Sequence, residues 1–385
     1  MKRTVYNEDH EAFRSVIRDF IAKEVSPHYE QWEHDNRVPR ELFHQLGELG
    51  VMGFGIPEEF GGPGETSYKY QTVISEEVAR AAVSFGHYTV TTGIVLPYLL
   101  NIADEEQKRR WLPGIASGET CLCIAMTEPG TGSDLAGIRT TAKLSEDGTH
   151  YVVNGAKTFI TGALNSELCV VVARTSPAPA EDRRLGLTLL VVPTDSEGFA
   201  YGRKLEKIGL RASDTSELSF TDVRVPVENV LGEVGQGFRH LGQNLARERL
   251  SIGVGAVATA TAAIGFAKEY TQQRQVFGKP VAAFQNTKFV LAECATEVEA
   301  GQALVDKGIE LDDTHELSPA DAAKIKLFCT ETAARVIDKC LQLHGGYGYM
   351  LEYPIARLYA DTRVSRIYGG TSEVMKTIIA KDLGL

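Results

Sequence analysis

The chain has 385 residues, enough for two or three domains around a sizeable core, and its 43% hydrophobic and 24% charged residues are ordinary for a globular protein. Its net charge of −11 argues against general nucleic-acid binding. No apolar run approaches the roughly 20 residues that cross a bilayer, so we expect no membrane span. The opening residues, MKRTVYNEDHEAF, lack the apolar core of a secretory signal, so we expect a cytoplasmic location.

The six cysteines and nine histidines indicate neither a disulfide framework nor a metal centre. The cysteines are scattered and form no CxxC pair, and the histidines show no metal-ligand spacing. Cys121 and Cys123 are two apart in an expected strand, a poor arrangement for a disulfide. We therefore expect buried, reduced thiols and no bound metal.

Hydrophobic periodicity divides the chain into three blocks. Residues 1–118 show helical spacing, with Ile17 and Ile21 on one face, and predict an N-terminal all-helical domain. Residues 119–231 carry short β-branched runs such as Leu187–Val192, separated by turn signals, and predict a central β domain, a sandwich or barrel. Residues 232–385 return to long alanine-rich stretches and predict a C-terminal four-helix bundle.

The predicted fold class is therefore α+β, with two helical domains flanking a small β domain. The absence of βαβ alternation disfavours a Rossmann domain. Leu311–Pro319 is the expected hairpin between two C-terminal helices, and Ser318-Pro319 is expected to start the second one. Its acidic stretch, Asp312–Glu316, is expected to be a solvated loop.

The run Ala125–Gly137 reads AMTEPGTGSDLAG and is the most informative stretch of the chain. It follows a short apolar segment, Cys121–Ala125, and packs small, turn-forming residues around hydroxyls and carboxylates. Backbone N–H groups in such a turn can face a phosphate or a flavin ring without interference from side chains. Taken alone, a glycine-rich loop is more often only a loop.

Further motifs follow in the C-terminal block: RQVFGK at Arg274–Lys279, QLHGGYG at Gln342–Gly348 and RIYGGTSEVMK at Arg366–Lys376. Together with Ala125–Gly137 and the earlier IPEEFGG, they resemble the acyl-CoA dehydrogenase flavoproteins over essentially the whole chain, and most closely the long-chain and isovaleryl-type branch. One position departs from the family pattern, because Thr131 stands where a smaller residue is usual.

The resemblance implies FAD as the cofactor and assigns its contacts residue by residue. The turn Ile124–Thr127 and the strand that carries Phe159–Thr161 would meet the flavin, while the C-terminal motifs would reach the FAD of a neighbouring subunit or its adenosine diphosphate portion. A guanidinium also suits a pyrophosphate on physical grounds. The implied cofactor-binding residues are Ile124, Met126, Thr127, Ser133, Phe159, Ile160, Thr161, Arg274, Phe277, Gln285, Gln342, Gly345, Gly346, Thr371 and Glu373. His344 is expected to be structural or flavin-adjacent.

The implied reaction removes a proton beside a thioester carbonyl and passes a hydride from the next carbon to the flavin, so it needs a carboxylate base. Many family members carry that base in a Tyr-Glu-Gly-Thr run, which here reads Tyr368-Gly369-Gly370-Thr371. The base must therefore come from elsewhere or be missing.

Glu248 is the candidate base. On a helix it shares a face with Leu241, Leu245, Ile252 and Gly255, and no basic residue lies three or four places away. A carboxylate in an apolar stripe is costly unless it is used, although pairing with a distant basic group would also explain it. The resemblance agrees, because the long-chain and isovaleryl branches place their base in a Glu-Arg-Leu run like Glu248-Arg249-Leu250. Burial there should raise the pKa of the carboxyl.

The resemblance also implies substrate contacts around this base. The backbone N–H of Gly369 would polarise the thioester carbonyl, and Arg249 would either lie near the CoA or hold its helix against a neighbour. The implied substrate-binding residues are Ser133, Leu245, Arg249, Tyr368, Gly369 and Gly370.

The expected activity is conversion of a fatty acyl-CoA to its trans-2-enoyl thioester. An electron-transfer flavoprotein is the implied acceptor, and a homotetramer, or at least a homodimer, is the implied assembly. Three alternatives stay open: a thioester on an acyl carrier protein or a short branched acyl group, a non-catalytic flavin-binding assembly protein, and oxygen-using chemistry.

Overall fold

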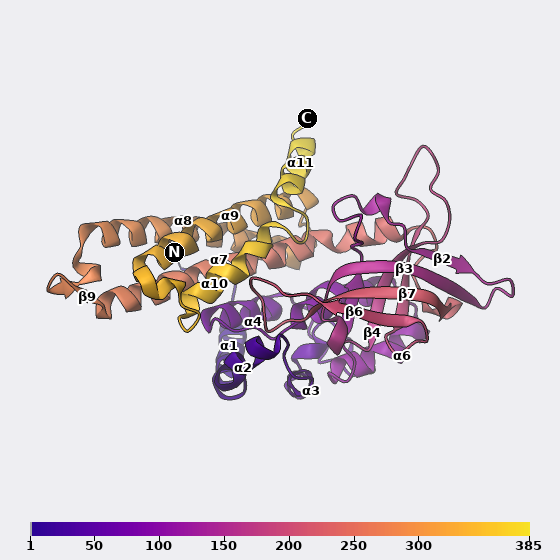
Figure 1. Ribbon diagram of the computed structural model, residues 1–385, viewed down its shortest axis with the longest axis horizontal. Helices are drawn as coiled ribbons and strands as arrows, with labels where there is room; N and C mark the ends of the chain where they lie inside the picture. Colours follow the sequence, from indigo (N-terminus) through magenta and orange to yellow (C-terminus); the bar gives the residue numbers. More distant parts are fainter. Residues whose placement is uncertain (1) are drawn as a thin grey trace.

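The computed structural model describes residues 2–385 and has three regions along the chain (Figure 1). The first is helical, and its core gathers the apolar residues of successive helices, Ile17 and Ile21 among them. Two π-helical turns interrupt it, at Ile21–Val25 and Val90–Val95. Its α-helices are α1 (Glu8–Phe20), α2 (Tyr29–Asp35), α3 (Glu41–Glu48), α4 (Lys69–Arg80), α5 (Leu96–Ile102) and α6 (Glu105–Ala116).

The central region is an eight-stranded sheet, in the order β6-β7-β3-β2-β4-β5-β8, with β1 pairing in parallel with β4. β4 and β5 are buried along nearly their whole length, which matches their continuous apolar sequences. The strands are β1 (Leu122–Ala125), β2 (Thr141–Leu144), β3 (His150–Thr161), β4 (Leu168–Arg174), β5 (Leu187–Pro193), β6 (Phe199–Lys204), β7 (Thr215–Pro226) and β8 (Val230–Leu231).

The third region is built on three long helices, with two shorter ones and a hairpin added. In Figure 1 the long helices run side by side away from the sheet, and α11 projects from them with the C-terminus. The elements are α7 (Gly237–Gln273), α8 (Gln285–Asp313), α9 (Pro319–His344), α10 (Pro354–Thr362) and α11 (Ser372–Asp382), with β9 (Gln275–Val276) and β10 (Lys279–Pro280). The expected succession of helical, β and helical domains is confirmed.

α7 is the central helix of the molecule and passes, by length and composition alone, as a membrane-spanning helix. The search for long apolar runs did not single out this helix, because small residues separate its apolar ones. The same helix packs against α4, α8 and α9, and 56% of its apolar window is buried inside the protein. Core helices of folded domains commonly have this composition.

The hairpin between α8 and α9 corrects one expectation. α9 begins at Pro319 as expected, with the Ser318 hydroxyl accepting the Asp321 N–H at 3.0 Å. However, α8 continues to Asp313, and Asp312 is buried against Arg247, with 2.9 Å between carboxylate and guanidinium. The solvated-loop interpretation is therefore wrong for Asp312, because the arginine that neutralises it comes from α7 and is invisible to local pattern.

The expectation of buried, reduced thiols is confirmed, because all six cysteines are buried and free. Across residues 2–385 no cluster of side chains has the composition of a metal site.

Candidate active site

Glu248 lies in the first third of α7 with only 4% of its surface exposed. Tyr98 from α5 donates its phenol proton to Glu248 Oε1 at 2.9 Å. Burial raises the pKa of Glu248 to about 7, although the Tyr98 hydrogen bond and the charge of Arg249 act to lower it. A carboxyl with that pKa can be ionised and still accept a proton readily near neutral pH, which suits a general base.

Two buried cations from different helices hold the glycine turn at 369–370. Arg249 Nε of α7 lies 3.4 Å from the Gly369 carbonyl oxygen, and Lys326 Nζ of α9 donates to the Gly370 carbonyl. Burial, with the charge of Arg249, lowers the pKa of Lys326 to about 8. Arg249 therefore links the glycine turn to α7. This contact favours the expectation that Arg249 holds its helix against a neighbouring segment over the expectation that it lies near the CoA.

Gly369 leaves no room for a side chain. It has φ +62°, and a Cβ atom there would lie 2.4 Å from Cδ1 of Ile252. Ile252 is one helical turn beyond Glu248, so the glycine turn faces the same stripe of α7 as the carboxylate. Within residues 2–385 the Gly369 N–H donates no hydrogen bond.

The loop after β1 is fixed by a buried lysine. Lys157 of β3 donates to the Met126 carbonyl at 3.0 Å, to the Val172 carbonyl at 2.8 Å and to Glu128 Oε1 at 3.0 Å. Glu128 in turn accepts the N–H groups of Arg139 and Thr140, each at 2.8 Å. Both ends of the 126–140 loop are thus tied to one buried ion pair.

Phe159 fits a flat aromatic ligand beside that loop. It keeps 65% of its surface exposed and has φ +60°, an uncommon conformation for a bulky residue that often marks a functional position. Its neighbour Ile160 is buried in the core of the sheet, so Ile160 can offer a ligand only its backbone. Ile124, Met126, Thr127 and Thr161 are half-buried at this edge, and Ser133 is exposed.

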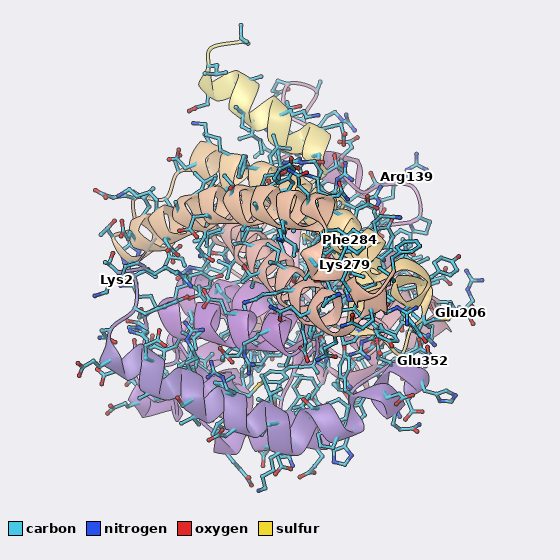
Figure 2. The ribbon with its side chains drawn as sticks, turned by 90° about the vertical axis from the view of Figure 1, so that its left-hand side faces the viewer. Lys2, Arg139, Glu206, Lys279, Phe284 and Glu352 are labelled. Atoms are coloured by element: carbon cyan, nitrogen blue, oxygen red, sulfur yellow. The ribbon has the colours of Figure 1, made fainter. Side chains whose placement is uncertain are left out.

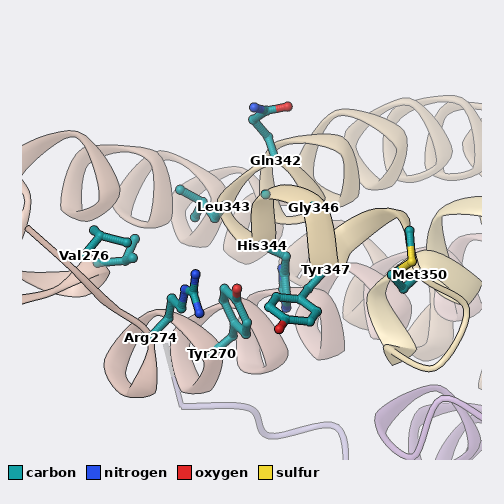
Figure 3. A pocket seen from close by; sticks show the side chains of 11 residues that line it. Tyr270, Arg274, Val276, Gln342, Leu343, His344, Gly346, Tyr347 and Met350 are labelled. Atoms are coloured by element: carbon teal, nitrogen blue, oxygen red, sulfur yellow. The ribbon is translucent and has the colours of Figure 1, made fainter.

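A separate cavity of about 540 Å³ lies at the junction of α7 and α9 (Figure 3). Arg274 and Tyr270 come from the end of α7, and they lie beside Tyr347 from the turn after α9. The Arg274 guanidinium is 5.7 Å from the Tyr347 ring centre. Gln342, Gly345 and Gly346 also line this cavity, so the structure brings four of the predicted cofactor residues together.

His344 has a structural role in this cavity. Its Nδ1 lies 2.8 Å from the Cys340 carbonyl oxygen, and its ring stacks on Tyr270 with 4.5 Å between centres. Burial lowers its pKa, which favours the neutral imidazole.

Within one chain, the cavity and Glu248 cannot belong to the same site. Arg274 is 26 residues further along the chain from Glu248, at the end of the same helix, which separates them by roughly 39 Å at 1.5 Å per residue. The hairpin residue Phe277, 95% exposed at φ +49°, projects from this remote end together with Gln285. Figure 2 views the molecule from this end, where Lys279 lies 4.2 Å from the Phe284 ring centre.

The remaining predicted residues lie at the start of α11 or near the base. Thr371 is the N-cap of α11, accepting the Val374 N–H at 3.3 Å, and Glu373 is exposed in its first turn. Tyr368 is half exposed beside the glycine turn, and Leu245 is half-buried one turn before Glu248. Sequence reasoning missed Tyr98, Lys157 and Lys326. No local signal marks the last two, because the burial of a lysine cannot be read from the sequence.

Comparison with known proteins decides the family. Residues 7–119, 123–223 and 235–384 match the N-terminal, middle and C-terminal domains of acyl-CoA dehydrogenase. The chain is 42% identical, over 99% of its length and 88% of the relative's, to the mitochondrial long-chain specific acyl-CoA dehydrogenase of Sus scrofa. The chain belongs to the acyl-CoA dehydrogenase family.

Solved structures agree. The acyl-CoA dehydrogenase of Geobacillus kaustophilus superposes with a TM-score of 0.95 at 44% identity, and each chain covers 100% of the other. An acyl-CoA dehydrogenase of Bacillus anthracis complexed with FAD gives a TM-score of 0.90 at 32% identity, covering 98% of this chain and 67% of that one. This acyl-CoA dehydrogenase family member is thus a flavin-dependent CH–CH oxidoreductase, and FAD is typical of its relatives.

Proposed function

We propose that this protein dehydrogenates a fatty acyl-CoA between its α and β carbons, with Glu248 as the base that removes the α-proton. The observation that carries the proposal is a buried carboxylate on an apolar stripe of α7, facing the glycine turn that lacks the usual side chain. When bound, FAD supplies the acceptor for the β-hydride. The protein's own groups bind, orient and deprotonate the substrate.

The polarising group in this proposal is the Gly369 N–H. A donor aimed at the thioester carbonyl stabilises the negative charge that develops there as the α-proton leaves. Arg249 and Lys326 hold the turn that presents this N–H. Their two positive charges also favour the enolate-like charge electrostatically, because the surroundings are buried.

We further propose that FAD lies along the 126–133 loop and Phe159, and that a second subunit contributes Arg274, Phe277, Gln285 and Gln342. A cavity and an exposed aromatic about 39 Å along α7 from the base support this arrangement. A homotetramer or homodimer, a long-chain substrate and an electron-transfer flavoprotein as acceptor are part of the same proposal. They rest on the family resemblance.

Anaerobic titration of the yellow holoprotein with acyl-CoAs, from isovaleryl to palmitoyl, tests the proposal. We expect one chain-length class to bleach the flavin of the wild type, and Glu248→Gln to keep its flavin but lose bleaching by at least a hundredfold in rate. Glu310→Gln, which removes an exposed carboxylate of α8, should behave as the wild type.

Other outcomes discriminate the alternatives. If no CoA ester bleaches the wild type, an acyl-carrier-protein substrate or a non-catalytic role replaces the proposal. Rapid oxygen consumption during turnover would indicate an oxidase. Bleaching that survives Glu248→Gln would assign the base to another residue.

A further inference from the structure

Tyr98 is the strongest feature that the proposed reaction leaves unexplained. It is 1% exposed, and its hydroxyl lies 2.9 Å from Glu248 Oε1 and 3.4 Å from the Leu241 carbonyl oxygen. Burial and the charge of Glu248 raise its pKa well above the ordinary value, so the phenol keeps its proton. One phenol proton thus faces two acceptors, and one of them changes its charge during the proposed reaction.

We propose that Tyr98 is a positioning residue that hydrogen-bonds Glu248 in both of its protonation states. This inference rests on the proposed function. While Glu248 is ionised, the phenol donates to the carboxylate. Once the carboxylate has taken the α-proton, the neutral carboxyl donates to the phenol oxygen, and the phenol proton turns to the Leu241 carbonyl. Tyr98 neither gains nor loses a proton, and Glu248 keeps the same position throughout.

A π-helical turn before α5 sets the direction of the Tyr98 side chain. α5 follows the π-helical turn Val90–Val95, and one extra residue in a turn rotates the following side chains by roughly 100° about the helix axis. Pro97, at the start of α5, lacks the N–H that a longer helix would need to pair. Leu96 and Leu99 then pack into the apolar core, while Tyr98 reaches across to α7.

Few other charged groups face Glu248. Arg249 lies next to it on α7 and approaches Gly369, and Lys326 of α9 binds the Gly370 carbonyl. Arg247, on the other side in sequence, pairs with Asp312 of α8 and covers Tyr68 at the start of α4. In the part of the chain that the structure describes, only Tyr98 donates a hydrogen bond to the Glu248 side chain.

The test compares Tyr98→Phe with Tyr88→Phe as holoenzymes. Tyr88 is a buried tyrosine of the same region whose hydroxyl donates to the Val51 carbonyl at 3.0 Å. The Tyr88→Phe variant therefore also loses a buried, hydrogen-bonded hydroxyl, but away from Glu248. The readout is the pH dependence of the rate of flavin reduction by the best acyl-CoA. The hydrogen bond to the ionised carboxylate is charge-assisted and therefore stronger than the bond to the neutral carboxyl. Losing Tyr98 as a partner consequently destabilises the ionised form more and raises the pKa of Glu248.

We expect the acid limb of the Tyr98→Phe profile to move up by about one pH unit, with roughly tenfold slower reduction at pH 6 and rates that converge toward the wild type at pH 9. The Tyr88→Phe profile should not move. A site-specific fluorotyrosine at position 98 keeps the packing and strengthens the donor, so it should shift the limb downward.

An acid limb that stays fixed in both position-98 variants overturns the inference. So does a uniform loss of rate at every pH, which would indicate a purely structural role. These failures are distinct from a failure of the proposed function, which is read from Glu248→Gln alone.

Discussion

At the scale of single residues, Glu248 combines a functional requirement with a cost in stability. Its pKa is raised from 4.5 to about 7 in the folded protein, so between these values the folded state binds more protons than the unfolded state. Folding stability attributable to this group therefore falls as pH rises from about 4.5 to 7. Above pH 7 the ionised carboxylate costs about 3 kcal/mol, at 1.4 kcal/mol for each unit of pKa.

Glu248→Gln should consequently stabilise the protein while abolishing its activity. The amide keeps the volume and still accepts the Tyr98 proton, but it carries no buried charge. We expect a higher melting temperature than the wild type at pH 8, and a much smaller difference at pH 5, where the wild-type carboxyl is neutral too. Thermal melting followed by flavin fluorescence measures the melting temperature of each protein at both pH values. A variant that melts lower than the wild type at pH 8 would show that charges other than that of Arg249 stabilise the carboxylate.

Gly369 offers a second residue-scale prediction, because two separate constraints exclude a side chain there. Its φ of +62° disfavours any L-residue, and a Cβ would lie 2.4 Å from Ile252 Cδ1. We expect Gly369→Ala to destabilise the protein by about 2 kcal/mol. Ile252→Val removes the Cδ1 atom, so adding it should recover about half of that loss, the part due to contact. Melting temperatures of the two single variants and the double variant measure the recovery, and strictly additive losses would remove the steric explanation.

Sequence reasoning reached Glu248 because the helical period is local: offsets of −7, −3, +4 and +7 place apolar residues around it on one helix. Tyr98 was out of reach, since it lies 150 residues away and follows a π-helical turn that breaks the period. Lys157 and Lys326 look like ordinary surface residues until the sheet and the bundle close around them.

At the scale of elements, the flavin-side loop depends on β3 through one ion pair. Lys157 is fully buried and holds three oxygen atoms, while Glu128 takes the N–H groups at the far end of the loop. Lys157→Met leaves the Glu128 carboxylate without its buried partner. Breaking a buried pair from one side costs about 3–5 kcal/mol. We expect lower thermal stability and, because the loop loosens, faster loss of FAD during gel filtration.

The same loop supplies the control. Arg183 and Asp134 form an ion pair at 3.1 Å in which both side chains are well exposed. Pairs of this kind contribute about 0–1 kcal/mol, so Arg183→Met should change neither melting nor flavin retention appreciably. Equal effects of the two substitutions would mean that the buried pair does not order the loop.

The type of each block, the boundaries of its helices and the order of its strands could be predicted to different extents. Helical and β blocks follow from periodicity, and Ser318-Pro319 marks the start of α9 because capping is a local interaction. The strand order was not predictable, because β1 pairs in parallel with β4, and β3 pairs antiparallel with β7, across long separations in sequence. The end of α8 was missed because Asp312 is stabilised by Arg247 of another helix.

At the scale of the whole molecule, α7 separates the two parts of the proposed flavin site. Glu248 lies in its first third, and Arg274 with its cavity follows its end, roughly 39 Å away. In the proposed arrangement, each part is incomplete in one chain and is completed by the partner subunit. A two-fold dimer would join Glu248 on one α7 to the end of the other α7, and would make two equivalent sites.

Subunit mixing tests this arrangement. Glu248→Gln subunits lack the base, and Arg274→Glu subunits place a carboxylate against the flavin diphosphate, so each homo-oligomer should be inactive or nearly so. In a mixed dimer, one site joins an intact Glu248 with an intact Arg274 from the partner, and the other site carries both changes. After unfolding and refolding an equal mixture with FAD, half of the dimers are mixed and half of their sites are intact, so about a quarter of wild-type flavin reduction should return. If each subunit instead completes its own site, mixing restores nothing beyond the sum of the two parents. A recovery near one quarter would place Arg274 in the active site of the neighbouring subunit.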